Sequence, residues 1–207
     1  MFQFIVLRWL WRIFLWWRFL ARTARMDLEL IPTHPDGFGG LGFLGEGQSS
    51  CFLLASPFAL IFAAHMAKAV QHGGSPQSYQ APAIAFVILC AILLMGPAMS
   101  LSGPLIRARR RGIFEYGRLG QAYVSQFDRK WVRGGAGDEP LLGTADIQSL
   151  ADISNSMKVV RELSPIPFER RHLLLFAVCI LVPAIPPLLL VMPLSEILGK
   201  VAAILVK

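Results

Sequence analysis

The side chains best suited to chemistry near neutral pH lie in one short segment, Ile31–Gly47. His34 and Asp36 place a titratable imidazole beside a carboxylate, a pairing that general bases and metal sites both use. Glycines such as Gly39 and Gly40 can turn backbone N–H groups toward an anion, for example a lipid phosphate. We therefore take His34, Asp36, Gly39 and Gly40 as candidate binding residues. The alternative is a loop held together by hydrogen bonds between its side chains and its backbone.

The sequence around His34 and Asp36 matches no known catalytic or metal-binding motif. A metal ion needs three or four donors, and the nearest additional donor in the sequence is Glu46. The sequence contains no nucleophile elbow, Walker motif, HExxH motif or kinase signature. We therefore predict no catalytic residue, no metal and no cofactor.

The spacing Gly37-x-Gly39-x-x-Gly42 matches the dinucleotide-binding fingerprint by accident. That fingerprint requires a strand before it and a helix after it, within a βαβ unit. Here a long apolar segment follows, and we expect Gly45 and Gly47 to interrupt any helix start. The match therefore predicts no nucleotide site.

A second group of candidate residues is the basic run Arg107, Arg109, Arg110 and Arg111. It directly follows an apolar segment, where arginines fix topology and attract anionic lipid headgroups. We take these four arginines as a candidate headgroup site. The net charge of +7 does not indicate nucleic acid, because the basic residues gather at the ends of apolar segments.

Three long stretches without Lys, Arg, Asp or Glu predict the helices that position these residues. They are Gly47–Ala67, Ala69–Ile106 and Leu173–Ser195. A hydrocarbon core about 30 Å thick requires roughly 20 apolar residues in a helix, and backbone groups there must pair within the helix. Only 16% of the residues are charged, against about 25% in soluble domains. We predict an all-α integral membrane protein with about three transmembrane helices, at 51–70, 81–103 and 172–193, the last broken by prolines.

The charges on the connecting segments predict the orientation of the spans. Five arginines precede the first span, and Gln71–Gln80 contains no Lys or Arg, whereas Leu105–Arg171 contains twelve. Short segments rich in Lys and Arg stay in the cytoplasm. We therefore expect Leu105–Arg171 on the cytoplasmic side of the membrane and Gln71–Gln80 on the opposite side.

Two segments precede the first span. Residues 1–26 mix tryptophans with arginines at helical spacing. They predict a basic helix that lies in the membrane interface, or the end of an upstream span missing from this chain. Residues 27–50 predict a loop rich in Gly and Pro. We expect the loop to fold against the cytoplasmic face at the entrance to the first span, where its apolar side chains would bury against the bundle; they are Phe38, Leu41, Phe43 and Leu44.

Residues 105–171 predict a cytoplasmic helical hairpin. Each of its helices carries an apolar stripe whose spacings of three and four are typical of a helix. The first stripe is Tyr116, Leu119, Tyr123, Phe127 and Trp131, and the second is Ile147, Leu150, Ile153, Met157 and Val160. We expect the two stripes to pack together. Residues 194–207 predict an interfacial tail helix.

Three segments carry a resemblance to other proteins. They are LIPTHPDGFGGLGFLG at Leu30–Gly45, EYGRLGQAYVSQFDRKW at Glu115–Trp131 and LLGTADIQSLADISNS at Leu141–Ser156. With these segments the chain resembles a group of uncharacterised bacterial multi-pass membrane proteins. The resemblance implies a location in the bacterial inner membrane, and it brings no activity, cofactor or catalytic residue with it.

These observations favour a non-enzymatic component of the inner membrane, either a scaffold or a transport-type subunit, because the spans contain almost no polar chemistry. The expected partners are anionic lipid headgroups and a second copy of the chain or another membrane protein. The alternative is a membrane-interface enzyme that acts on lipid through His34 and Asp36.

Overall fold

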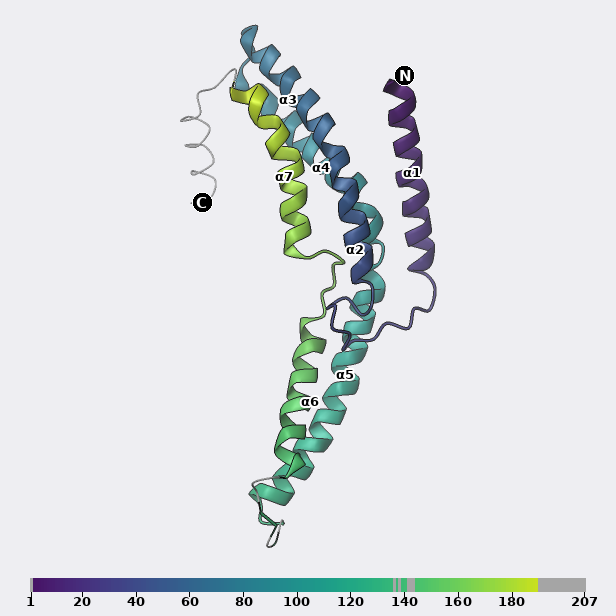
Figure 1. Cartoon of the computed structure of the whole chain (residues 1–207), viewed down its shortest axis with the longest axis vertical. Helices are drawn as coiled ribbons and strands as arrows, with labels where there is room; N and C mark the ends of the chain where they lie inside the picture. Colours follow the sequence, from purple (N-terminus) through teal and green to yellow (C-terminus); the bar gives the residue numbers. More distant parts are fainter. Residues whose placement is uncertain (1, 136, 138, 141–143, 190–207) are drawn as a thin grey trace. The chain divides into compact units, whose positions relative to one another are not determined.

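The computed structural model describes residues 2–135, 137, 139–140 and 144–189, and this part of the chain contains helices and no strand. The predicted tail helix at 194–207 lies outside the described residues. In chain order the elements are α1 (Phe2–Thr23), α2 (Gly42–Ser49), η1 (Ser50–Leu54), α3 (Ala55–Gln71), η2 (Pro76–Tyr79), α4 (Gln80–Met99), α5 (Ser102–Phe127), η3 (Asp128–Val132), α6 (Ala145–Glu162) and α7 (Arg170–Leu189) (Figure 1).

The chain forms two compact units. Of the described residues, the first contains the start of α1 through Ile13, the segment Gly45–Pro97 and residues 168–189. The second contains Phe14–Leu44 and Ala98–Pro167. Each unit is described by itself below.

The described chain holds three helical segments that are long and apolar enough to cross a membrane, as the sequence predicts, and apart from residues 42–44 and 98–99 they belong to the first unit. They are Gly42–Gln71, Gln77–Met99 and Arg170–Pro187, of 30, 23 and 18 residues. The first begins earlier than expected, because α2, η1 and α3 follow one another without a break.

The prediction of a loop throughout residues 27–50 is therefore wrong at its end. Gly42–Ser49 is helical in spite of Gly45 and Gly47. The start of α2 is stabilised from outside, since the Asp36 carboxylate accepts the N–H of Gly42 at 2.9 Å. A helix start leaves such N–H groups without an intrahelical partner, and a carboxylate is a strong cap for them.

In the first unit, α3 packs most closely on α7. The buried face of α3 is a row of alanines four residues apart, at Ala55, Ala59, Ala63 and Ala67. Small side chains at this spacing let two helix backbones approach each other. Below this row the buried ring of Phe52 contacts the rings of Phe168 and Phe176, with centroids 6.0 and 5.4 Å away.

The prediction that prolines break the last span is also wrong, because α7 runs through Pro183, Pro186 and Pro187. A proline has no N–H, so Pro183 leaves the carbonyl of Cys179 without its helical partner. The Ser56 hydroxyl of α3 donates to that carbonyl at 3.0 Å. A neighbouring helix thus supplies the hydrogen bond that the proline removes, as membrane helices often require.

The second unit is built on α5 and α6, which lie side by side (Figure 1). The Tyr123 hydroxyl donates to the Asp146 carbonyl at 2.9 Å, and the Asp146 carboxylate accepts from Trp131 Nε1 and Lys130 Nζ, each at 2.9 Å. The hydrogen bonds from Lys130 and Trp131 lower the pKa of Asp146, so the carboxylate stays charged at the end of the helix pair.

The predicted stripes of the hairpin are wrong at two positions, since Leu119 and Ile147 are 57% and 44% exposed. On α5 the position that faces α6 belongs to Gly120, where a Cβ would lie 3.5 Å from Ile153 Cγ2. Leu119 is turned about 100° from it on the helix. The hairpin also begins earlier than expected, because α5 starts at Ser102 and encloses the arginine run. Pro104 is compatible with that start, since proline is tolerated in the first turn.

The contact between Ser56 and the carbonyl freed by Pro183 generates a prediction. Ser56→Ala should lower the free energy of unfolding by about 1–3 kcal/mol, because a buried carbonyl loses its partner. The same change in a Pro183→Ala background should cost much less, because residue 183 then supplies an N–H. Thermal unfolding in detergent micelles of both single variants and the double variant measures this coupling. An equal cost of Ser56→Ala in both backgrounds would contradict the assignment.

Candidate functional site

The predicted site at His34 and Asp36 is a closed turn of the second unit. The Asp36 carboxylate accepts backbone N–H groups from Phe38, Gly40 and Gly42 at 2.8, 3.1 and 2.9 Å. His34 Nδ1 lies 2.8 Å from Asp36 Oδ1. The glycine amides therefore converge on an anion as the sequence suggests, and that anion is a carboxylate of the chain itself.

The protonation of Asp36 follows from this geometry. Burial alone would raise the pKa of Asp36, but hydrogen bonds from the amides of Phe38, Gly42 and Gly40 and from His34 together lower it below its usual value. The carboxylate is thus ionised near neutral pH, and its oxygens accept several hydrogen bonds. A low pKa makes it a weak proton acceptor, so the geometry fits a structural anion better than a general base.

Gly39 has a backbone role in the same turn. It adopts φ +64°, and its carbonyl accepts the N–H of Ile31 at 3.4 Å. A Cβ at this position would lie 3.3 Å from Leu30 Cβ. Of the four candidate binding residues, the structure thus brings His34, Asp36 and the Gly40 amide together, while Gly39 shapes the turn that holds them.

The turn is fastened to α5 and to the chain after α6. Arg111 Nη2 donates to the Leu30 carbonyl at 3.1 Å, and the Ser164 N–H donates to the Gly37 carbonyl at 2.9 Å. Pro32 lies so close to Gly112 of α5 that a Cβ there would be 2.5 Å from Pro32 Cβ. The segment therefore connects α5 and α6 as part of the unit's core.

Apolar side chains of the segment complete this packing. Phe38 is buried in a cluster with Leu30, Leu105, Ala108 and Leu163, and Leu41 packs partly against it. The prediction that the segment folds up and buries apolar side chains is confirmed, although the helix it packs on in this cluster is α5 and not a predicted span. It is wrong for Phe43, which is 68% exposed. The reason is the early start of α2, which turns Phe43 away from that helix's buried face.

The four candidate arginines do not form one site. Arg109 donates through Nε and Nη2 to the Arg161 carbonyl near the end of α6, at 3.1 and 2.7 Å. Arg111 holds Leu30, as described above. Arg107 and Arg111 lie one turn apart and line a cavity of about 260 Å³, together with Asp27. Arg109 and Arg111 thus serve partly as structural donors, and the headgroup site at Arg107, Arg109, Arg110 and Arg111 stays a prediction.

One group of charged residues in the first unit was not predicted. Arg171 of α7 bonds Glu46 of α2 and also Glu169, whose Oε2 lies 2.8 Å from Arg171 Nε. The neighbouring His172 is 3% exposed. Its Nδ1 accepts the N–H of Glu169 at 3.0 Å, and its Nε2 lies 3.5 Å from Glu46 Oε1. This cluster holds α2, at Glu46, to the start of α7.

The signal for this cluster is present in the sequence. Glu169 and His172 stand three residues apart directly before an apolar run. That is the spacing of a capping box, in which the side chain of the third helical residue accepts the N–H of the cap residue. Histidine is an unusual acceptor in this motif, which is why the spacing was not interpreted as a helix start.

The described residues contain no group of three His, Cys, Asp or Glu side chains placed to hold a metal ion. Comparison with protein-family models, with curated proteins and with solved structures finds no match. The assignment of function therefore depends on the geometry of the chain itself, and the resemblance to bacterial membrane proteins stays a prediction.

The Asp36 turn generates a prediction with a defined pH dependence. Asp36→Asn should lower the free energy of unfolding near pH 7 by about 1–2 kcal/mol, because an amide cannot accept all of these N–H groups. The pKa of Asp36 is lower in the folded protein than in the unfolded chain, where it is about 3.9. The contribution is therefore present above that value and is lost as the pH falls through the folded pKa.

The measurement is unfolding in detergent micelles, followed by circular dichroism between pH 7 and pH 3. The stability difference between wild type and Asp36→Asn should shrink as the pH falls below about 4. Asp27→Asn, in the same unit and on an exposed side chain, is the matched control and should change little. Equal stability of Asp36→Asn and wild type at pH 7 would show that the turn does not depend on this carboxylate.

Proposed function

We propose that the chain is a multi-pass protein of the bacterial cytoplasmic membrane and a non-enzymatic component of the scaffold type. The observation that carries the proposal is the outward face of the first unit. Large apolar side chains are exposed along its helices, among them Ile84, Ile88 and Ile92 of α4 and Leu174, Leu181 and Val182 of α7. In water such continuous apolar faces would be costly, whereas lipid tails accommodate them.

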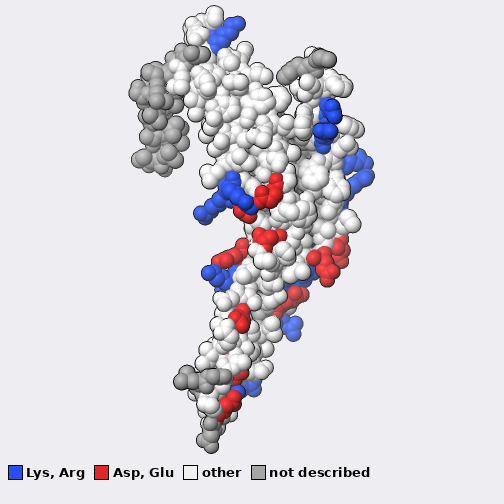
Figure 2. All heavy atoms as spheres, in the orientation of Figure 1, with Lys and Arg blue, Asp and Glu red and all other residues white. Residues whose placement is uncertain are grey.

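The distribution of charge supports a membrane position for this unit. Figure 2 shows a surface over α3 and α7 that is almost free of charged side chains, while Lys, Arg, Asp and Glu are spread over α5 and α6. At the start of α7, Arg171 and Glu46 mark one end of the apolar surface. Charged groups at the ends of apolar helices are typical of a lipid–water boundary.

The interior of the first unit favours a scaffold over a transport-type subunit. Two of its polar side chains donate to backbone carbonyls of other helices: Gln48 Nε2 to the Leu94 carbonyl at 2.7 Å, and Ser56 to the Cys179 carbonyl at 3.0 Å. Buried His172 accepts a backbone N–H through Nδ1, and its Nε2 lies 3.5 Å from Glu46 Oε1. A transport path needs polar groups that face a cavity and can exchange partners. Groups already engaged by the helices themselves fit a static bundle.

The enzyme alternative has less support. It relies on His34 and Asp36, and the Asp36 carboxylate accepts the amides of its own turn. A lipid-hydrolysing site needs a base whose lone pairs can reach a substrate proton. The turn instead supplies the connection that holds α5 and the end of α6.

The partner surface of the proposed scaffold lies on α5. Ile113, Phe114 and Val124 are exposed by 38, 66 and 47% on a helix that otherwise carries many charges. Apolar side chains exposed among polar ones mark protein interaction surfaces. The proposed partner is a second copy of the chain or another membrane protein.

The membrane position generates the first prediction of this proposal. In a variant with Ala at Cys51, Cys90 and Cys179, single cysteines placed at Ser78 and at Ser154 report the two sides of the membrane. A membrane-impermeant maleimide should label Ser78→Cys in intact cells and Ser154→Cys only after the cells are broken. The protein should stay in the pellet after alkaline carbonate extraction. Labelling of position 154 alone in intact cells would overturn the orientation, and release by carbonate would overturn membrane insertion.

The scaffold role generates a second prediction. Ile113→Glu combined with Val124→Glu should reduce the size of the complex extracted in mild detergent, because two apolar contacts are replaced by charges. Blue-native electrophoresis measures that size. Gln121→Glu and Gln126→Glu place two acidic residues on exposed positions of the same helix and form the matched control. A complex of unchanged size in the Ile113/Val124 variant would remove α5 as the partner surface.

A further inference from the structure

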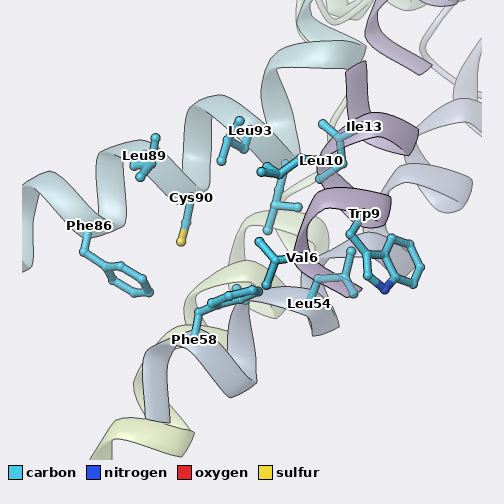
Figure 3. A pocket seen from close by; sticks show the side chains of 12 residues that line it. Val6, Trp9, Leu10, Ile13, Leu54, Phe58, Phe86, Leu89, Cys90 and Leu93 are labelled. Atoms are coloured by element: carbon cyan, nitrogen blue, oxygen red, sulfur yellow. The ribbon is translucent and has the colours of Figure 1, made fainter. Parts of the chain in front are cut away.

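An apolar cavity of about 190 Å³ lies in the first unit, between the N-terminal half of α1 and the helices α3 and α4. Figure 3 shows side chains from these segments around one common space. The lining includes Val6 and Leu10 of α1, Phe58 of α3, and Phe86, Cys90 and Leu93 of α4. The side-chain heteroatoms of the lining are the Cys90 sulfur and the indole nitrogen of Trp9, so the space offers water few hydrogen-bond partners.

The chemistry of the lining selects a hydrocarbon occupant. A cavity of about 150 Å³ lined by Leu, Ile and Phe stays free of water and binds small apolar molecules. The present cavity is larger and similarly lined. It is too small for a helix, whose diameter with side chains is about 10–12 Å. A single flexible chain of methylene groups has a suitable cross-section.

The packing of α1 also requires an occupant. The pair α3 and α7 packs closely, whereas α1 has no comparably close helix partner. Apolar residues of α1 nevertheless face α3 and α4 across the cavity, as Figure 3 shows for Val6, Leu10 and Ile13. An empty gap would forfeit the dispersion contacts of these side chains.

The charge on α1 identifies the headgroup that belongs to the occupant. The guanidinium carbon of Arg12 lies 5.2 Å from the centre of the Trp9 ring, and Trp9 lines the cavity. Arg8 stands one turn before Arg12, and α1 contains no Asp or Glu. A cation is thus held beside an apolar cavity with no acidic side chain on the same helix to neutralise it.

We propose that the cavity holds one acyl chain of an anionic phospholipid, whose phosphate group binds Arg12 and Arg8. The inference rests on the membrane position proposed above. The bound lipid fills the gap between α1 and the helices α3 and α4, and its headgroup neutralises the arginines of α1.

The test is native mass spectrometry of the purified full chain in mild detergent, with added phosphatidylglycerol or phosphatidylcholine. One phosphatidylglycerol molecule should bind the wild-type chain at least about tenfold more tightly than phosphatidylcholine, as expected for a charge-assisted contact. Cys90→Phe, which fills the cavity, should weaken binding of both lipids about tenfold. Ile88→Phe, on the exposed face of the same helix, is the matched control and should bind as wild type does.

A second pair of variants tests the headgroup without touching the cavity. Arg12→Gln should remove the preference for phosphatidylglycerol while phosphatidylcholine binding stays unchanged. Arg18→Gln, which removes an equal charge from the same helix, should keep the preference. These exposed positions allow folding even if Cys90→Phe does not.

Two results would overturn the proposal. The first is equal binding of both lipids by wild type and Arg12→Gln. The second is loss of a dimer, with lipid binding unchanged, in Cys90→Phe, which would assign the cavity to a second copy of the chain. Carbonate extraction and cysteine labelling test the membrane position separately, so a chain that is inserted but binds no lipid here would contradict this inference alone.

Discussion

The first unit depends on one constraint: every backbone N–H and C=O that leaves water must find a partner within the chain. Helical hydrogen bonds meet most of this requirement, and where a proline removes a donor another helix can supply one, as α3 does for α7. Pro183 removes one N–H of α7, and Ser56 of α3 replaces it at the Cys179 carbonyl. The alanine row of α3 lets that helix lie close enough for a serine hydroxyl to reach across. The close packing of α3 on α7 therefore also makes it possible to hydrogen-bond the carbonyl that Pro183 leaves free.

The same constraint explains the glycine-rich turn of the second unit. A chain that reverses direction around Gly39 and Gly40 leaves several N–H groups pointing to one place. Asp36 accepts them, and its pKa falls below the usual value because their hydrogen bonds outweigh the effect of burial. The backbone N–H groups of this turn are arranged as they would be to bind an anion, and the anion that they bind is the carboxylate of Asp36. This arrangement allows Phe38 to enter the core and Pro32 to lie on Gly112.

The sequence was sufficient for features that depend on composition or on near neighbours. Stretches without charge predicted the three apolar helices, and residues at spacings of three and four predicted α5 and α6. Features that depend on distant partners were not predictable in this way. Neither the helicity of α7 across Pro183 nor the capping of α2 at Gly42 is visible without knowing that Ser56 and Asp36 lie nearby. Leu119 was misplaced because a stripe of large apolar residues hid the glycine that faces α6.

Some polar side chains of this protein stabilise its own fold, whereas other side chains are exposed and can contact a partner. Asp36, Gln48 and Ser56 bond to backbone within their own units. The surfaces that remain for interaction are the apolar outer faces of α3, α4 and α7, the exposed apolar residues of α5 and the arginines of α1. These surfaces match lipid tails, a protein partner and anionic headgroups respectively. A chain in which these polar groups bond to its own backbone and the outer surfaces are apolar or cationic is suited to act by contact. That is the physical basis for preferring a scaffold to a transporter or an enzyme.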